Sequence, residues 1–274
     1  MTIDMGWPRS ILLVGCGNMG GAMLAGWLRA GFDPARFTVV DPLLAEAPQG
    51  VELLRELPQG RVFDLMQLGV KPQALDGVAP ALTALAGPDT VLLSILAGTE
   101  LASLRARFPD CRGIVRVMPN LAAAIGKSPM GVAAQGLDQQ GCDAMTALLA
   151  PLGTPEWVGE ELFDAVTALG GSGPAFVYRF IDALAQGGAA VGLPADQALR
   201  LALATVEGAS ALAGAAGVDP AELARRVASP GGTTEAGLRV MDADGAILKL
   251  AEATLRAARD RGAEMAAAAR AAKG

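Results

Sequence analysis

Residues 11–20 read ILLVGCGNMG, a short apolar run that leads into the glycine pattern G-x-G-x-x-G. The run Ile11–Val14 predicts a buried strand, and Met19–Ala30 predicts a helix directly after the glycines. A second apolar run, Phe37–Val40, is followed by Asp41, 21 residues after the last glycine of the pattern. A strand, a glycine-rich turn, a helix and an acidic residue in this order are the fingerprint of a dinucleotide-binding unit.

Each glycine of the pattern has a distinct expected role. Gly15 would permit the tight turn, Gly17 would let the backbone approach a pyrophosphate, and Gly20 would let the helix pack on the strand. The start of the helix offers free N–H groups to phosphates. Asp41 is placed to accept a hydrogen bond from a ribose hydroxyl. A glycine-rich turn that binds no ligand is the open alternative.

Apolar runs alternate with helical patterns over the rest of the first half. Several runs are continuously apolar, which is typical of a parallel sheet buried on both faces. The pattern predicts an α/β domain, a Rossmann-like doubly wound sheet over residues 1–159. Further strands are expected at residues 65–70, 91–96, 114–117 and 131–134, and helices within 46–57 and at 73–86, 100–108 and 139–150.

The second half, residues 160–274, contains no convincing strand pattern and is expected to be an all-helical domain. Glycine followed by proline, at Gly192 with Pro194 and at Gly217 with Pro220, marks the end of one helix and the start of the next. Helix faces rich in alanine allow close packing, which favours a dimerisation domain. Helices are expected at residues 162–191, 195–216, 220–227, 234–241 and 246–272.

Composition excludes several classes of function. The chain has 274 residues and a net charge of −6, which argues against a nucleic-acid or anionic-membrane surface. It has no histidine, so a Ser-His-Asp triad and a His-ligated zinc are excluded. The three widely spaced cysteines, Cys16, Cys111 and Cys142, suggest no metal site and a reduced, cytoplasmic setting. The uncharged stretch at residues 10–28 carries five glycines, which makes it a poor membrane span.

Two glycine-rich clusters interrupt the helical half. Residues 170–176 read GGSGPAF, and residues 229–234 read SPGGTT. Glycines free successive N–H groups where a helix begins, so the second cluster could hold an anion such as a substrate carboxylate. An ordinary helix-capping loop, with Ser229 or Thr233 as the cap, is the open alternative.

These clusters resemble a known family. Residues 164–176, DAVTALGGSGPAF, look like the D-A-V-T-x-L-S-G-S-G-P-A-Y block of pyrroline-5-carboxylate reductases, and residues 227–234 are similar to its V-x-S-P-G-G-x-T signature. In the first half, residues 70–72 (VKP), 97–98 (AG) and 116–120 (RVMPN) fall where the family has V-K-P, A-A-G and R-x-M-P-N-T-P. The resemblance runs from about residue 11 to residue 265.

The resemblance implies an NAD(P)H-dependent enzyme that reduces 1-pyrroline-5-carboxylate to L-proline, the last step of proline synthesis. It also implies a homodimer, often assembled further into a decamer, with the active site between one chain's cofactor and the other chain's helices. The implied substrate-binding residues are Ser172, Gly173, Ser229, Pro230, Gly231, Gly232, Thr233 and Thr234, with Thr234 as the catalytic residue at the ring nitrogen. The expected cofactor-binding residues are Gly15, Gly17, Asn18, Met19, Gly20, Asp41, Val70, Lys71, Pro72, Ala97, Gly98, Met118 and Asn120.

Three residues depart from the family pattern. Leu121 stands where the family usually has threonine, and Phe176 replaces the usual tyrosine. Asp41 stands where many relatives carry serine, threonine or asparagine. A carboxylate there would repel the 2′-phosphate of NADPH, and no lysine or arginine lies between Arg36 and Arg55 to compensate. The sequence therefore favours NADH, whereas the habit of the family is NADPH.

Two other functions remain open. A β-hydroxyacid dehydrogenase shares the two-domain plan but depends on a lysine in the helical half, near a G-x-x-x-K motif. The chain's lysines are Lys71, Lys127, Lys249 and Lys273, and none follows the 170–176 cluster in that way. A non-catalytic NAD(H) sensor would bind the cofactor without turnover and would not need the 229–234 loop.

Overall fold

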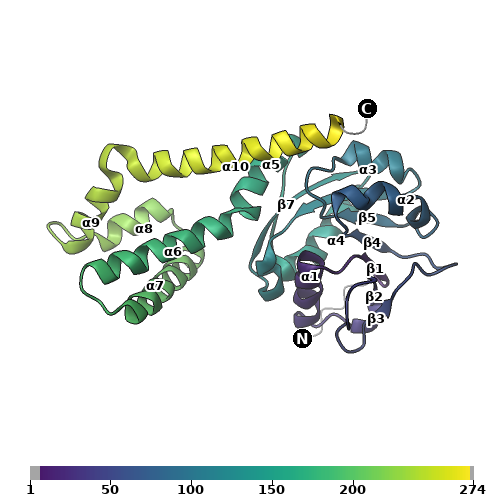
Figure 1. Cartoon of the computed structure of the whole chain (residues 1–274), viewed down its shortest axis with the longest axis horizontal. Coiled ribbons are helices and arrows are strands. Elements are labelled where there is room, and N and C mark those ends of the chain that lie inside the picture. The colour runs from purple at the N-terminus through teal and green to yellow at the C-terminus, as the bar shows by residue number, and fades with distance from the viewer. Residues whose placement is uncertain (1–6, 272–274) are drawn as a thin grey trace. The chain divides into compact units, whose positions relative to one another are not determined.

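The computed structural model describes residues 7–271, and within them the first unit is built on an eight-stranded sheet of order β3-β2-β1-β4-β5-β6-β7-β8 (Figure 1). Its neighbouring strands are parallel except for β6 and β7. The predicted Rossmann-like sheet is therefore confirmed. The strands are β1 (Ile11–Val14), β2 (Phe37–Val40), β3 (Glu52–Leu54), β4 (Leu65–Leu68), β5 (Val91–Ser94), β6 (Gly113–Met118), β7 (Ser128–Gln135) and β8 (Gly153–Trp157).

The antiparallel pairing of β6 with β7 follows from a short connection. Only residues 119–127 lie between the two strands, and five of them form the 3₁₀ helix η3 (Leu121–Ile125). A parallel crossover needs a dozen or more residues, so the chain turns back instead.

Helices cover both faces of the sheet. On one face, α1 (Asn18–Arg29) and α4 (Gln139–Leu149) pack into one hydrophobic core. There the indole N–H of Trp27, on α1, donates to the carbonyl oxygen of Leu148, on α4, at 2.9 Å. On the other face, α2 (Leu75–Thr83) and α3 (Leu101–Arg107) bury their leucines against the same strands. Burial on both faces explains why most residues of the central strands are apolar.

Two edge strands differ from the sequence expectation. A short helix was expected within residues 46–57, and the structure has β3 there instead. Pro48 and Gly50 interrupt any helix, and Gly50 takes a φ of 86°. Glu52 then pairs with Thr38 of β2 and accepts a hydrogen bond from its hydroxyl at 2.8 Å. Strand β8 was not expected, because its sequence contains both Gly153 and a proline and much of it is exposed.

The segment after residue 160 packs with the first unit. The described chain divides into two compact units: the first consists of residues 7–171 and 258–271, and the second of Ser172–Ala257. The α-helix expected over residues 162–191 is divided into η5 (Glu160–Leu162), α5 (Phe163–Val166), the π-helical turn η6 (Thr167–Gly171) and α6 (Gly173–Ala190). The carbonyl oxygen of Gly170 accepts a hydrogen bond from the amide of Asn120 at 2.8 Å, and Phe163 is buried. By these contacts the first compact unit extends to Gly171, and the domain boundary expected at residue 160 remains a prediction.

The second unit consists of helices throughout its described residues. Helix α6 lies beside α7 (Ala195–Ala216), as Figure 1 shows, and a Cβ added at Gly188 would lie 3.2 Å from the Cβ of Ala198. The small residues thus allow the close packing that the alanine-rich pattern indicates. The remaining helices are α8 (Pro220–Val227), α9 (Thr233–Asp242) and α10 (Ala246–Ala271), whose last turns belong to the first unit.

Many large apolar side chains of the second unit are exposed. On α7, Leu199, Leu203 and Leu212 are between 47% and 61% exposed. This helix is long and apolar enough to cross a membrane, and only 11% of its most apolar window is buried. A helix that packs against another copy of the chain has the same properties, so length and composition alone do not assign a membrane.

Candidate active site

The glycine-rich turn between β1 and α1 is packed closely against the end of β4. Gly15 has a φ of 85°, and a Cβ at this position would lie 3.0 Å from the backbone of Gly69. A Cβ at Gly20 would lie 2.9 Å from the carbonyl oxygen of Gly15. Both positions therefore require glycine, for conformation at Gly15 and for close approach at Gly20.

Gly17 differs from its neighbours, because a Cβ there would meet nothing within 4 Å. It is the N-cap of α1 and is exposed, and no side chain caps the helix. Asn18 and Met19 form the first helical positions, where N–H groups have no intrahelical acceptor. Open space beside free N–H groups at a helix start fits a nucleotide pyrophosphate.

Asp41 joins the two loops that follow β1 and β2. Its Oδ2 accepts a hydrogen bond from the N–H of Cys16 at 2.8 Å, and its Oδ1 accepts from Leu43 at 2.8 Å and Leu44 at 3.1 Å. Partial burial alone would raise the pKa of Asp41, but these three donors and nearby Arg55 together lower it. The carboxylate is therefore charged at neutral pH, and it holds the turn in addition to any contact with a ribose.

Arg55 is a residue that the sequence reasoning missed. Its guanidinium donates to the carbonyl oxygens of Asp41 at 3.0 Å and Ala45 at 3.2 Å, and also to that of Leu44. Leu54 pairs with Val40 in the β2–β3 register, so Arg55 directly follows β3 beside Asp41. Only recognition of β3 could have placed this cation at the cofactor end of the sheet.

The other expected cofactor residues follow the carboxyl ends of β4, β5 and β6. Parallel strands bring these ends to one edge of the sheet, where dinucleotides bind. Val70, Lys71 and Pro72 follow β4, and the last two are exposed. Ala97 and Gly98 follow β5 and are also exposed.

Met118 and Asn120 are buried at the end of β6. The side chain of Asn120 accepts a hydrogen bond from the N–H of Ala122 at 2.9 Å and donates to Gly170. Its backbone N–H donates to the hydroxyl of Ser128 at 2.9 Å. Asn120 thus anchors the loop after β6, and its contact with a cofactor remains a prediction.

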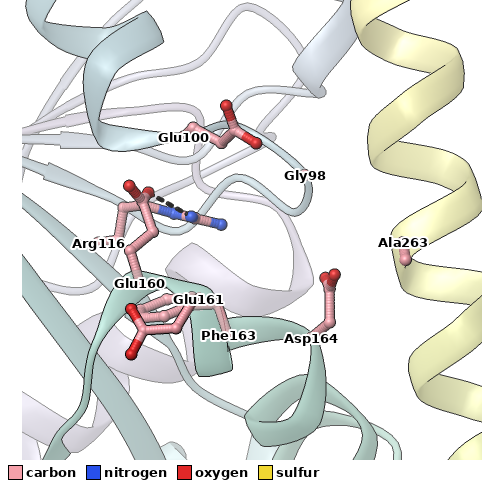
Figure 2. A pocket seen from close by; sticks show the side chains of 8 residues that line it. All are labelled: Gly98, Glu100, Arg116, Glu160, Glu161, Phe163, Asp164 and Ala263. Carbon is pink, nitrogen blue, oxygen red and sulfur yellow. Dashed lines mark hydrogen bonds and ion pairs between the residues drawn. The ribbon is translucent and has the colours of Figure 1, made fainter.

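A cavity of about 430 Å³ opens beside Gly98 (Figure 2). The buried guanidinium of Arg116 forms an ion pair with Glu160, with 2.6 Å between Nη1 and Oε1, and lies 4.3 Å from the ring centre of Phe163. The same Glu160 oxygen accepts a hydrogen bond from the N–H of Leu101 at 2.6 Å, at the start of α3. The lining residues are Gly98, Glu100, Arg116, Glu160, Glu161, Phe163, Asp164 and Ala263.

Removing the carboxylate of Glu160 is expected to destabilise the fold. Glu160→Ala would leave the Arg116 guanidinium, only 7% exposed, without its ion-pair partner. Because the Glu160 side chain itself is 31% exposed, we expect a loss of about 1–3 kcal/mol, less than for a fully buried pair. Urea denaturation measures it, with Glu161→Ala as the matched control. Equal stability of the two variants would contradict the assigned role.

The 229–234 loop lies in the second unit and leads into α9. Gly231 has a φ of 71°, and Gly232 is the N-cap of α9 without any side-chain cap. The N–H of Gly232 donates to the carbonyl oxygen of Ser229 at 2.9 Å. Neither Ser229 nor Thr233 therefore caps the helix in the structure. Binding of an anion by this loop remains a prediction.

The first turn of α9 begins with Thr233 and Thr234, and both are exposed. Glu235 was missed by the sequence reasoning: its Oε2 accepts a hydrogen bond from the N–H of Gly231 at 2.7 Å. The carboxylate thus holds the loop in place beside the uncapped helix start. Ser172 is the N-cap of α6, also without a side-chain cap, and Gly173 is its first residue. Their contact with a substrate remains a prediction.

The cysteines are not activated. Burial, with a smaller effect from Asp41, raises the pKa of the Cys16 thiol to about 11. Burial also raises the pKa of Cys111 to about 11. Neither thiol is a thiolate at neutral pH. In the part of the chain that the structure describes, no group of three or more acidic, cysteine or histidine side chains could hold a metal ion.

The chain is similar to known proteins over nearly its whole length. Residues 160–265 match the family model for pyrroline-5-carboxylate reductase dimerisation. The chain is 36% identical to the pyrroline-5-carboxylate reductase of Pseudomonas aeruginosa, covering 96% of this chain and 98% of that one. The structure resembles the pyrroline-5-carboxylate reductase of Coxiella burnetii with a TM-score of 0.86, 27% identity, and coverage of 93% and 98%. It also has the fold of the Plasmodium falciparum pyrroline carboxylate reductase crystallised with NADP, with a TM-score of 0.80, 22% identity, and coverage of 94% and 98%.

Proposed function

Because this chain belongs to the pyrroline-5-carboxylate reductase family, we propose that it reduces 1-pyrroline-5-carboxylate to L-proline with a nicotinamide cofactor, the last step of proline biosynthesis. The observation that carries the proposal is the 36% identity to the Pseudomonas aeruginosa enzyme over 96% of this chain. The glycine-rich turn supports the proposed binding of a nicotinamide cofactor, because its open side fits a pyrophosphate. The uncapped start of α9 supports the proposed binding of the substrate, because its N–H groups fit a carboxylate.

The reaction needs little acid–base machinery, since a protonated imine is already electrophilic. A bound nicotinamide would supply the hydride. The N–H groups at the start of α1 would hold its pyrophosphate, and the 229–234 loop would hold the substrate carboxylate. The hydroxyl of Thr234 would orient the ring nitrogen. Positioning and electrostatics of this kind suffice for an enzyme without histidine.

Cofactor oxidation by the purified chain tests the proposal. Nicotinamide absorbance should fall steadily with 1-pyrroline-5-carboxylate present and stay constant without it. Reduction of NAD⁺ or NADP⁺ by a β-hydroxy acid, which would itself be oxidised, would favour the dehydrogenase alternative instead. Tight cofactor binding without turnover of any imine would favour the sensor alternative.

We propose that NADH is the better cofactor and that NADPH is used at higher concentration. The charged carboxylate of Asp41 lies at the end of β2, where a 2′-phosphate would approach. Arg55 offsets part of this charge, but its guanidinium donates to three backbone carbonyl oxygens. The remaining repulsion is expected to be about 1–2 kcal/mol, or roughly five- to thirtyfold in affinity.

Asp41→Ser is expected to narrow the ratio of kcat/KM for NADH over NADPH by roughly five- to thirtyfold. The variant also loses acceptors for the N–H groups of Cys16, Leu43 and Leu44, so its Tm should fall. Steady-state kinetics with both cofactors measure the ratio. Asp33→Ser is the control, because Asp33 caps a distant turn. A strong NADPH preference of the native chain would refute the proposal, as would an unchanged ratio in Asp41→Ser.

We propose that the chain forms a homodimer through its helical half, that these dimers assemble into a decamer as the family resemblance implies, and that the chain acts in the cytoplasm. The exposed leucines of α7 support an interface, since such patches are rarely left in water. Light scattering of dilute protein should give the mass of a dimer or a larger assembly. Leu203→Glu, which puts a charge on this surface, should shift the mass towards the monomer. A fully active monomer would contradict the shared active site.

A further inference from the structure

Gln67 is a polar residue in the middle of an apolar sheet. It lies on β4 and pairs with Leu13 of β1 on one side and with Leu93 of β5 on the other. Gln67 is 0% exposed. Side chains alternate along a strand, so Gln67 shares a face with Leu65, which belongs to the core beneath α1.

The amide of Gln67 is unpaired. Neither its Nε2 nor its Oε1 has a hydrogen-bond partner among the described residues, and no other buried side chain of those residues is in this position. Leaving a buried amide unpaired is costly, whereas a leucine of similar size would pack with the surrounding leucines at no such cost. Folding alone therefore gives no reason for a glutamine here.

The position of the amide points to the nucleotide site. A Cβ added at Gly20 would lie 3.7 Å from Gln67 Nε2 and 2.9 Å from the carbonyl oxygen of Gly15. The amide thus lies under the first turn of α1, which has no side-chain cap and whose first N–H groups have no intrahelical acceptor. The strand order reverses between β1 and β4, which is where dinucleotides bind in such sheets.

We propose that Gln67 positions the glycine-rich turn for the cofactor. In the cofactor-bound state its amide hydrogen-bonds backbone groups of the Gly15–Gly20 turn, directly or through one buried water. Its carbonyl can accept from an N–H group, and its NH₂ can donate to a carbonyl oxygen of the turn. Gln67 does not touch the nucleotide; it acts through the turn, and the inference rests on the cofactor part of the proposed function.

Two variants of the full chain test the role. Gln67→Leu and Gln67→Met keep the size of the side chain and remove the amide. Their Tm without ligand should rise by roughly 2–6 °C, because the unpaired polar group is gone. Their Kd for NADH and for ADP-ribose, measured by calorimetry, should increase roughly 5- to 50-fold. The kcat at saturating cofactor should stay within about twofold, since the effect is on binding.

Leu65→Met is the matched control, because Leu65 lies on the same face of β4 two residues further from the turn. It should change neither Kd nor Tm appreciably. Native affinity for both ligands in the two Gln67 variants would overturn the inference, whatever their Tm. A native chain that binds NADH but does not oxidise it with 1-pyrroline-5-carboxylate would contradict the proposed reaction instead, and the Kd comparison would still decide the role of Gln67.

Discussion

Replacing Thr234 with alanine is expected to lower kcat/KM for 1-pyrroline-5-carboxylate by roughly 10- to 1,000-fold, about 1.4–4 kcal/mol. Thr234 lies exposed in the first turn of α9, after the N-cap Gly232. A hydroxyl at this place can orient the imine nitrogen while the N–H groups of the same turn hold the carboxylate. Its loss would leave the substrate bound but poorly aligned, and alignment accounts for a large part of enzymatic rate enhancement.

Thr234→Ser should recover much of the loss, because it restores the hydroxyl without the methyl group. Thr254→Ala is the control, since Thr254 lies on α10 and donates to the carbonyl oxygen of Leu250 in its own helix. Its steady-state constants should match those of the native chain. A Thr234→Ala variant with native kcat and KM would show that the assigned role is wrong.

Replacing Gly17 with valine is expected to abolish useful cofactor binding while leaving the fold intact. A Cβ at Gly17 would meet no protein atom within 4 Å, so the valine has room in the free enzyme. That same room is where a pyrophosphate would approach the N–H groups of α1. We expect Kd for NADH to rise by roughly 100-fold or more, about 2.8 kcal/mol, by calorimetry.

Two other glycines sharpen this prediction. Gly77→Val, at another open position on α2, should leave the affinity for NADH unchanged. Gly20→Val should lower the Tm as well as the affinity, because its Cβ would lie 2.9 Å from the carbonyl oxygen of Gly15. Normal binding of NADH by Gly17→Val would place the pyrophosphate elsewhere.

The elements that sequence predicts best are those whose signal is local. The runs at β1 and β2 are buried on both faces, so their residues are apolar apart from Thr38 and easily recognised. The edge strand β3 pairs with one neighbour only and has half-exposed and exposed residues, so it carries no such pattern. With β3 unrecognised, Arg55 could not be placed beside Asp41.

The residues of the candidate site likewise fall into those that a short stretch of sequence reveals and those that only the fold brings together. The glycine-rich turn and the 229–234 loop are each read within one short stretch, since a helix start needs only its own residues. Arg116 and Glu160 are 44 positions apart, and only the packing of the segment after β8 on the sheet brings them together. Gln67 lies within an apolar run of the sequence. Its proposed role follows only from its closeness to Gly20, which lies on the neighbouring helix α1.

The most direct test of the central claim follows the transferred hydrogen. Purified chain is given 1-pyrroline-5-carboxylate and NADH that carries deuterium in both positions at C4 of the nicotinamide, and the product is examined by mass spectrometry and NMR. Hydride transfer to the imine carbon predicts L-proline with a single deuterium on its δ-carbon, formed in equal amount to the NADH consumed. Unlabelled proline, or NADH oxidation without proline, would contradict the account.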